Sequence, residues 1–536
     1  MAPANPQRRP RRRNVGWLTA SLVTVPLIPL SVIASAAPAM ATEHATNELV
    51  DELRSDIDAI LEDPALEGAT SGVVVTDADS GETLYSRDTD TSLLPASNMK
   101  LFATAAALEV LGPDHTFETE VVAEEQGPNV PELYLVGGGD PTLSADDLDS
   151  MAADVAASGV TSVGDLYADD TWFDAERLVD DWWPEDEPYA YSAQISALTV
   201  AHGDRYDTGV TEVTVTAGGE GEPVEVAPGA AEGYVEVDNR AVTGPAGGGN
   251  TLSIDRPVGT NTITVTGTLP ADAAPSVALR TVDEPAGMAG HVFARALEEN
   301  GVTVEGEIAR GEVPAEWDDP GVVAEHTSMP LDEVLVPLMK FSNNGHTEML
   351  IKSIGRHTAD EGTWEAGLAG MDEALRGIGV DTSGLVLNDG SGLSRTDRVT
   401  AGTVVDLLDR VQDAPWYEVW HHSLPVAGAE DPFVGGTLAS RMRGTVAEGV
   451  AQGKTGTMSG VSALSGYVQG PDGGELYFSV VNNGHAGSEP LHVQDAIVVR
   501  LAEYLGHDGA RADAALRQDV PVTVGGDLEC SWEAAC

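Results

Sequence analysis

The sequence predicts an α/β (α+β) core that is divided by a large β-rich insertion. Helix and hairpin patterns typical of such a core lie before residue 116 and return after residue 330. The stretch between them is rich in Gly, Thr and Val and alternates in the way that strands do. A length of 536 residues also exceeds one ordinary domain. We therefore expect one discontinuous core domain over 42–115 and 331–510, with 116–330 forming one or two accessory domains.

The first 41 residues have the pattern of an export signal. Five arginines precede an apolar run over 17–33, and Ala39-Met-Ala41 supplies the small residues that signal peptidase requires. The apolar run is short, which favours a removable signal peptide over a membrane anchor. We expect a secreted protein that is cleaved near Ala41, and Arg12-Arg13 leaves twin-arginine export open.

The first part of the core combines a helix, a hairpin and a second helix. Two short runs, 72–75 and 82–85, flank the turn residues Asp79-Ser-Gly81 and predict the hairpin. A second helix is expected from Ser97 to Leu111. An apolar stripe at helical spacing predicts the first helix: Leu49, Leu53, Ile57, Ile60 and Leu61.

Ser97 and Lys100 stand at the head of that second, alanine-rich helix. Their spacing places the amine one turn above the hydroxyl on the same face, where a neutral amine can take the proton of the serine. The same pattern fits a helix-capping serine followed by a surface lysine. Lysine usage favours the chemical interpretation, because this acidic chain keeps only four lysines, at positions 100, 340, 352 and 454. A lysine retained in such a chain is expected to do what arginine cannot.

Strands and helices are also predicted in the insertion and in the second part of the core. In the insertion, 211–216 and 262–266 alternate as strands, and an apolar face over 288–297 predicts a helix. After residue 330, helices are expected over 331–339, from about Thr347, and over 493–505. A hairpin is expected from 462–468 and 475–481. A polar tail over 511–536 contains the only cysteines, Cys530 and Cys536, which could close a small disulfide loop.

Three motifs in order carry a resemblance to a known family. Ser97-x-x-Lys100, Ser342-x-Asn344 and Lys454-Thr455-Gly456 are the elements of the penicillin-recognising serine acyl enzymes. Over about 70–470 the chain resembles the D-alanyl-D-alanine carboxypeptidase/endopeptidase family, the class C low-molecular-mass penicillin-binding proteins. The resemblance implies a penicillin-binding/β-lactamase-like transpeptidase core and two accessory domains, one nested in the other. Supporting segments are 137–143, 188–198, 388–394, 423–428 and 436–438 with Arg441.

The resemblance also implies roles for the motif residues. Ser97 would attack the carbonyl of the penultimate D-alanine, with Lys100 as general base. Ser342 would pass the proton to the leaving amine, and Asn344 would hold Lys100 and the substrate amide. The substrate-binding segment would be Lys454, Thr455, Gly456 and Thr457, with the lysine and the two threonine hydroxyls on the terminal carboxylate. Backbone N–H groups of Ser97 and Thr457 would form the oxyanion hole. The implied partners are peptidoglycan stem peptides, with β-lactams as inhibitors.

Composition excludes other classes of partner. Without the leader, 23 basic side chains remain against 87 acidic ones, a net charge of −64. Nucleic acid would be repelled, and the charge is expected to suit salty surroundings. No cofactor and no metal site are predicted, because His421-His422 has no third ligand near it in sequence. Asp140 and Asp389 lie in glycine-rich turns, and Lys340 is expected either to line the site or to pair with an acid.

Three alternatives stay open. A β-lactamase would share the motifs, but no Glu accompanies Asn388 where a class A enzyme needs one for its deacylating water. A serine esterase could use the same core. In a non-catalytic wall-binding protein, the β-rich accessory domains would bind the cell wall. The balance of carboxypeptidase and endopeptidase activity and the oligomeric state stay open as well.

Overall fold

The structure is a computed structural model that describes residues 37–124, 127–317 and 320–507. The predicted signal peptide up to residue 36 and the polar tail with Cys530 and Cys536 lie outside these residues. The chain divides into two compact units, Met1–Glu48 and Leu49–Cys536. The features below belong to the second unit.

The core is built on a five-stranded antiparallel sheet. Its strands come from both parts of the core, before and after the insertion. The N-terminal hairpin pairs with the C-terminal strands along β1 and β21, from Thr70 opposite Asn483 to Asp77 opposite Leu476. The K-T-G strand, β19, lies at one edge of the sheet. In spatial order the strands are β19 (Ala451–Met458), β20 (Val461–Gln469), β21 (Glu475–Asn483), β1 (Thr70–Asp77) and β2 (Thr83–Arg87).

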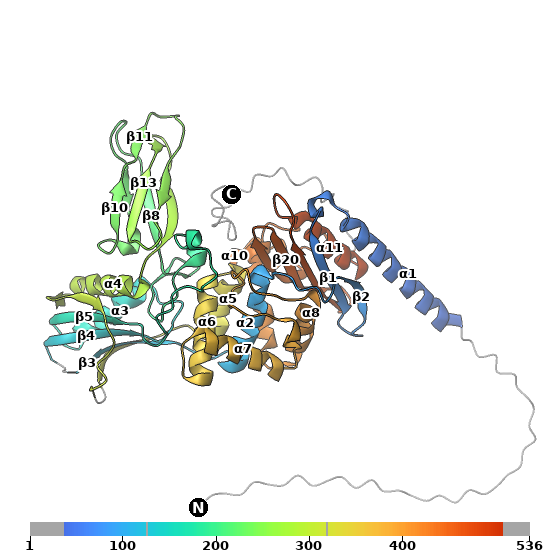
Figure 1. Cartoon of the computed structure of the whole chain (residues 1–536), viewed down its shortest axis with the longest axis horizontal. Coiled ribbons are helices and arrows are strands. Elements are labelled where there is room, and N and C mark those ends of the chain that lie inside the picture. The colour runs from blue at the N-terminus through green and yellow to red at the C-terminus, as the bar shows by residue number, and fades with distance from the viewer. Residues whose placement is uncertain (1–36, 125–126, 318–319, 508–536) are drawn as a thin grey trace, which may run out of the picture. The chain divides into compact units, whose positions relative to one another are not determined.

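Helices cover both faces of this sheet (Figure 1). On one face, Val73 and Val75 pack with α11 (Leu491–Tyr504) and with the part of α1 (Ala37–Ile60) from Val50 onward. On the other face, Val74 packs against a helical layer. Alternate residues of β1 therefore face two cores, as expected for a strand buried on both sides. The helices of the second layer are α2 (Met99–Val110), α5 (Leu331–Lys340), α6 (Asn344–Ala359), α7 (Trp364–Gly377), α8 (Ala401–Arg410) and α9 (Tyr417–Ser423); α10 (Pro432–Gly435) is one turn.

Helix α2 is enclosed by the other helices. Every residue from Met99 to Leu108 is buried, and the helix packs against α6 and α7. A helix that is mostly apolar on every face is stable only in such a position. Lys100 on this helix is therefore removed from solvent, with no exposed surface.

The first and last parts of the insertion, before residue 170 and after residue 284, together form a mixed sheet covered by two helices. We call them the outer part. Strand β3 pairs antiparallel with β4 and β18, whereas β4 and β5 run parallel. The strands are β3 (Glu118–Ala123), β4 (Asn129–Gly137), β5 (Ser162–Asp169), β16 (Thr303–Val304), β17 (Ile308–Arg310) and β18 (Gly321–Thr327), and the helices are α3 (Ala145–Ala157) and α4 (Pro285–Glu299).

The stretch between β5 and α4 contains strands, three 3-10 turns and irregular loops, with no α-helix. We call its residues 201–281 the nested segment. Its strands are β6 (Ala201–His202), β7 (Asp207–Thr208), β8 (Val210–Thr216), β9 (Glu225–Ala227), β10 (Glu236–Asn239), β11 (Val242–Gly244), β12 (Ser253–Asp255), β13 (Thr262–Thr266), β14 (Thr268–Pro270) and β15 (Ser276–Thr281). The β-rich texture predicted for the insertion is thus confirmed in both parts, because the outer part also contains a six-stranded sheet. Helix α4 covers the predicted helical run 288–297, and α3 is a further helix.

Two local predictions were wrong. Leu49 is 52% exposed, and Val50 takes its place on the buried face of α1. Helix α6 begins at Asn344 instead of near Thr347, because the side chain of Asn343 caps it by accepting the N–H of His346. No helix within the described ranges is both long and apolar enough to cross a membrane.

Candidate active site

Ser97 and Lys100 lie on the same face of the chain, as their spacing predicts. Ser97 belongs to a 3-10 turn (Ala96–Asn98) that runs into α2, and it is only partly exposed. The ammonium Nζ of Lys100 donates to Ser97 Oγ at 3.0 Å, to Asn344 Oδ1 at 2.6 Å and to the Ser391 carbonyl at 2.9 Å. Lys100 is fully buried, and α2 has Asn98 as its N-cap. The interpretation as a capping serine followed by a surface lysine is therefore wrong.

The backbone around the nucleophile is strained and closely packed. Ala96 and Ser342 both have left-handed backbones without being glycine, with φ of +45° and +57°. Such conformations cost about 1–3 kcal/mol each and collect at functional sites. Two glycines allow neighbouring segments to approach. A Cβ on Gly392 would lie 1.9 Å from the Ala96 carbonyl, and one on Gly456 would lie 3.1 Å from Ser97 N.

The S-x-N motif connects α5 to α6. Asn344 is the first residue of α6; its Oδ1 accepts from Lys100, and its Nδ2 donates to the Tyr191 carbonyl at 2.8 Å. The Ser342 hydroxyl accepts from Lys454 Nζ at 2.8 Å. The motif therefore contacts both lysines, Lys100 through its asparagine and Lys454 through its serine.

The K-T-G motif lies on edge strand β19. Lys454 is fully buried, and its carbonyl accepts from Asn98 Nδ2 at 2.9 Å, which ties the strand to the residue after Ser97. The Thr455 hydroxyl donates to Thr437 Oγ1 at 2.8 Å. The Gly453 N–H donates to the Pro425 carbonyl, away from β20. Because N–H groups alternate along a strand, the N–H of the partly exposed Thr457 points to the same edge.

Three buried carboxylates hold the loop 388–394, which presents the Ser391 carbonyl to Lys100. Each accepts backbone N–H groups of this loop: Glu348 those of Gly390 and Ser391, Asp389 those of Gly392 and Ser394, and Asp397 those of Asn388 and Asp389. Burial, followed by the charge of Asp389, raises the pKa of Glu348 to about 7. Asp389 thus shapes a turn, as predicted, and so does Asp140, which accepts from the backbone and hydroxyl of Thr142.

Lys340 neither lines the site nor pairs with an acid among the described residues. It is 2% exposed and donates to the Leu424 carbonyl at 2.5 Å. Burial alone lowers its pKa to about 8. Both expectations for this residue are therefore corrected, because a backbone carbonyl satisfies the ammonium.

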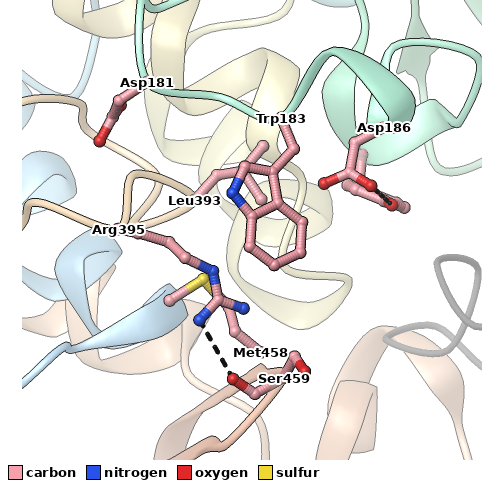
Figure 2. A pocket seen from close by; sticks show the side chains of 8 residues that line it. Asp181, Trp183, Asp186, Leu393, Arg395, Met458 and Ser459 are labelled. Atoms are coloured by element: carbon pink, nitrogen blue, oxygen red, sulfur yellow. Dashed lines mark hydrogen bonds between the residues drawn. The ribbon is translucent and has the colours of Figure 1, made fainter.

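A pocket of about 190 Å³ adjoins these motifs (Figure 2). Its walls come from segments that also contact the motif residues: Tyr191, whose carbonyl accepts from Asn344, the 388–394 loop, and the end of β19. Arg395 lies over the ring of Trp183 at 4.5 Å and donates to the Ser459 carbonyl. Burial raises the pKa of Asp186 and lowers the pKa of Arg395. The lining residues are Asp181, Trp183, Asp186, Tyr191, Leu393, Arg395, Met458 and Ser459.

Fold and motifs together define a penicillin-binding serine peptidase. The solved structure of penicillin binding protein 4 (dacB) from Haemophilus influenzae has the same fold, with a TM-score of 0.72 at 22% identity over 84% of this chain and 99% of that one. This similarity confirms the predicted fold class.

The chain belongs to the D-Ala-D-Ala carboxypeptidase 3 (S13) family, whose pattern matches residues 53–504. A D-alanyl-D-alanine carboxypeptidase of Actinomadura sp. (strain R39) is 68% identical over 535 residues, 98% of each chain. Carboxypeptidase DacB of Mycolicibacterium smegmatis is 29% identical over 80% of this chain and 79% of its own length. The resemblance drawn from the motifs is confirmed, and the chain is a serine-type D-Ala-D-Ala carboxypeptidase.

Proposed function

We propose that this carboxypeptidase is secreted and trims peptidoglycan stem peptides through an acyl-enzyme on Ser97, and that β-lactams inhibit it by acylating the same hydroxyl. The observation that carries the proposal is the 3.0 Å contact between Lys100 Nζ and Ser97 Oγ, made by a lysine with no exposed surface. An amine withdrawn from water and placed against a partly exposed hydroxyl is suited to take its proton.

In the proposed reaction, Ser97 Oγ attacks the carbonyl carbon of the penultimate D-alanine while neutral Lys100 takes the hydroxyl proton. The oxyanion accepts from the backbone N–H groups of Ser97 and Thr457, each worth about 3 kcal/mol in comparable sites. The C–N bond then breaks, and the leaving D-alanine amine receives a proton through Ser342. Water completes the cycle by attacking the ester and releasing Ser97.

The substrate carboxylate is proposed to bind beside Lys454 and the hydroxyls of Thr455 and Thr457. Lys454 contacts Ser342, so the carboxylate site and the proton path share one cation. A net charge of −59 on the whole chain repels anions at long range. The buried ammonium of Lys454 supplies the local positive charge that offsets this repulsion.

The adjoining pocket is proposed to receive the side chain of the residue before the two D-alanines. Trp183, Leu393 and Met458 offer apolar walls, while Arg395 and Asp186 offer one cation and one acid. That combination suits an aliphatic side chain that ends in both an ammonium and a carboxylate.

Endopeptidase activity follows from the same chemistry if the leaving amine belongs to a second stem peptide instead of free D-alanine. Product analysis of digested wall fragments tests the whole proposal. Release of free D-alanine supports carboxypeptidase action, and separation of cross-linked dimers supports endopeptidase action. Absence of both, with rapid turnover of penicillin or of simple esters, would establish a β-lactamase or an esterase. Absence of any turnover or penicillin adduct would leave a wall-binding protein.

A further inference from the structure

One wall of the substrate pocket is held from the nested segment. Trp183, Asp186 and Tyr191 line the pocket, and Glu187 lies between them in sequence. Glu187 is not a lining residue; its side chain is only 4% exposed and turns to partners in the nested segment. The wall therefore depends on contacts formed outside the pocket.

Arg256, directly after β12, is the main partner of Glu187. It is fully buried, and its Nη2 donates to Glu187 Oε1 at 2.8 Å and to the Glu187 carbonyl at 3.3 Å. Its Nη1 donates to the Thr260 carbonyl at 2.6 Å. The second carboxylate oxygen of Glu187 accepts from the Gly259 N–H at 2.8 Å. One turn of the nested segment thus surrounds the carboxylate of Glu187. A buried ion pair such as that of Arg256 with Glu187 tolerates little displacement.

The end of β15 holds the same stretch of backbone. The Thr281 hydroxyl donates to the Glu187 carbonyl and accepts from Arg256 Nη2, and the Thr281 N–H donates to the Pro188 carbonyl at 3.2 Å. Next along the wall, the guanidinium of Arg280 lies 5.4 Å from the ring of Tyr189, which stacks on Tyr191. Tyr191 in turn donates through its hydroxyl to Asp186 at 2.9 Å. A continuous set of contacts therefore runs from Arg256 to the Tyr191 hydroxyl and the Asp186 carboxylate, the two polar groups of this wall.

We propose that the nested segment determines which substrate side chains the enzyme accepts, because Arg256 and Thr281 fix the pocket wall at Glu187 and Pro188. Arg256 is a positioning residue for specificity and does not itself contact the substrate. The proposal rests on the proposed function, in which the pocket receives the side chain before the D-alanines. The catalytic residues Ser97, Lys100 and Lys454 receive no hydrogen bond from Arg256.

The test compares two stem peptides that differ only in that side chain. One carries an aliphatic chain ending in an ammonium and a carboxylate, and the other carries a methyl group. Arg256→Lys keeps the charge but loses the planar set of donors that holds Glu187. We expect it to lower the preference for the charged side chain about tenfold, mainly through KM, because an ångström-scale shift of a positioning group is costly. Acylation by a small penicillin should stay within about twofold of wild type, because that reaction needs only the catalytic groups.

Two further variants keep the test decisive. Arg240→Lys is the matched control, since the Arg240 side chain lies in the same segment, is 68% exposed and pairs with its near neighbour Asp238 instead of with Glu187. The double variant Glu187→Gln, Arg256→Met removes both charges and avoids leaving one buried alone. The proposal is supported if the preference for the charged side chain falls in both Arg256 variants and stays at the wild-type value in Arg240→Lys. An unchanged preference, or an equal loss with both peptides and with penicillin, overturns it. Wild-type enzyme that neither cleaves stem peptides nor forms a penicillin adduct would instead contradict the proposed function.

Discussion

The four lysines of the chain are all buried, yet they fall into two pairs with different surroundings. Their exposed fractions are 0% for Lys100, Lys352 and Lys454, and 2% for Lys340. Lys100 and Lys454 each donate to a serine hydroxyl of a motif. Lys352 forms an ion pair with Asp174 and lies over the ring of Trp364, whereas Lys340 donates to a backbone carbonyl.

The difference shows that burial of a cation does not by itself mark a catalytic group. What distinguishes Lys100, the proposed general base, is its partner, the hydroxyl of the partly exposed Ser97. We expect Lys352 to stabilise the fold and Lys340 to be tolerated by it. Substituting each lysine in turn therefore separates chemistry from stability.

Lys100→Ala should have the largest effect, a loss of at least about a thousandfold in the rate of penicillin acylation, because the general base is removed. Lys100→Arg should be nearly as inactive, since a guanidinium keeps its proton. Stopped-flow kinetics of penicillin acylation measure both losses. Each variant should first show the circular dichroism spectrum of the wild type, so that it is known to be folded. An active Lys100→Arg variant would show that this position needs only positive charge.

Lys454→Ala should lower both stem-peptide cleavage and penicillin acylation by about a hundredfold, since a hydrogen-bonded charge is lost. It should also move the acidic limb of the pH–rate profile to higher pH, because Lys100 without a second cation nearby holds its proton more firmly. The control is Thr437→Val, which removes a hydroxyl that bonds Thr455 and leaves Lys454 in place. An acidic limb that stays fixed or moves down would contradict this electrostatic role.

Lys352→Met should leave activity per folded molecule within about twofold of wild type but lower the free energy of unfolding by about 2 kcal/mol. The carboxylate of Asp174 would lose its partner, although its 26% exposure permits partial hydration. Urea unfolding measures the loss, and adding Asp174→Asn should restore part of it. A loss of activity per folded molecule well beyond twofold would place Lys352 with Lys100 and Lys454.

Lys340→Met should have the smallest effect, within about 1 kcal/mol of wild-type stability at neutral pH, because it removes a buried charge that has no acidic partner among the described residues. Burial lowers the pKa of Lys340 to about 8 from its ordinary 10.5. Between these values the unfolded chain binds more protons than the folded chain, so this lysine makes stability rise with pH. Unfolding at several pH values should show a slope in wild type that is reduced in the variant. Equal slopes would mean that the lysine titrates normally.

Much of the fold, in the core and in the insertion, could be predicted because its signals are local. Strand β13 has the bounds of the alternating run 262–266, and α5 extends the predicted helix by one residue to Lys340. Leu49 was misplaced because Leu49 and Val50 are adjacent apolar residues, and only packing decides which of them faces inward. The start of α6 was missed because the capping side chain belongs to a residue of the S-x-N motif.

The surroundings of the site could not be predicted in the same way. Lys100 is held by the carbonyls and amides of distant segments, and a backbone carbonyl such as that of Ser391 leaves no trace in the identity of its residue. Glu348 and Arg256 find their partners through tertiary packing, 43 and 69 positions away in the sequence. Two of the segments that supported the family resemblance, 188–198 and 388–394, contain the carbonyls of Tyr191 and Ser391, but their sequence did not show that these groups accept from Asn344 and Lys100. The domain boundaries and the roles of the site residues stay predictions.

The central claim is that Ser97 is the residue acylated by substrate and by β-lactams. Incubation with a labelled penicillin, followed by peptide mapping, tests it most directly. The adduct should lie on the peptide that contains Ser97, persist because its hydrolysis is slow, and be absent from Ser97→Ala. An adduct on another residue, or no adduct on folded wild-type protein, would contradict the claim.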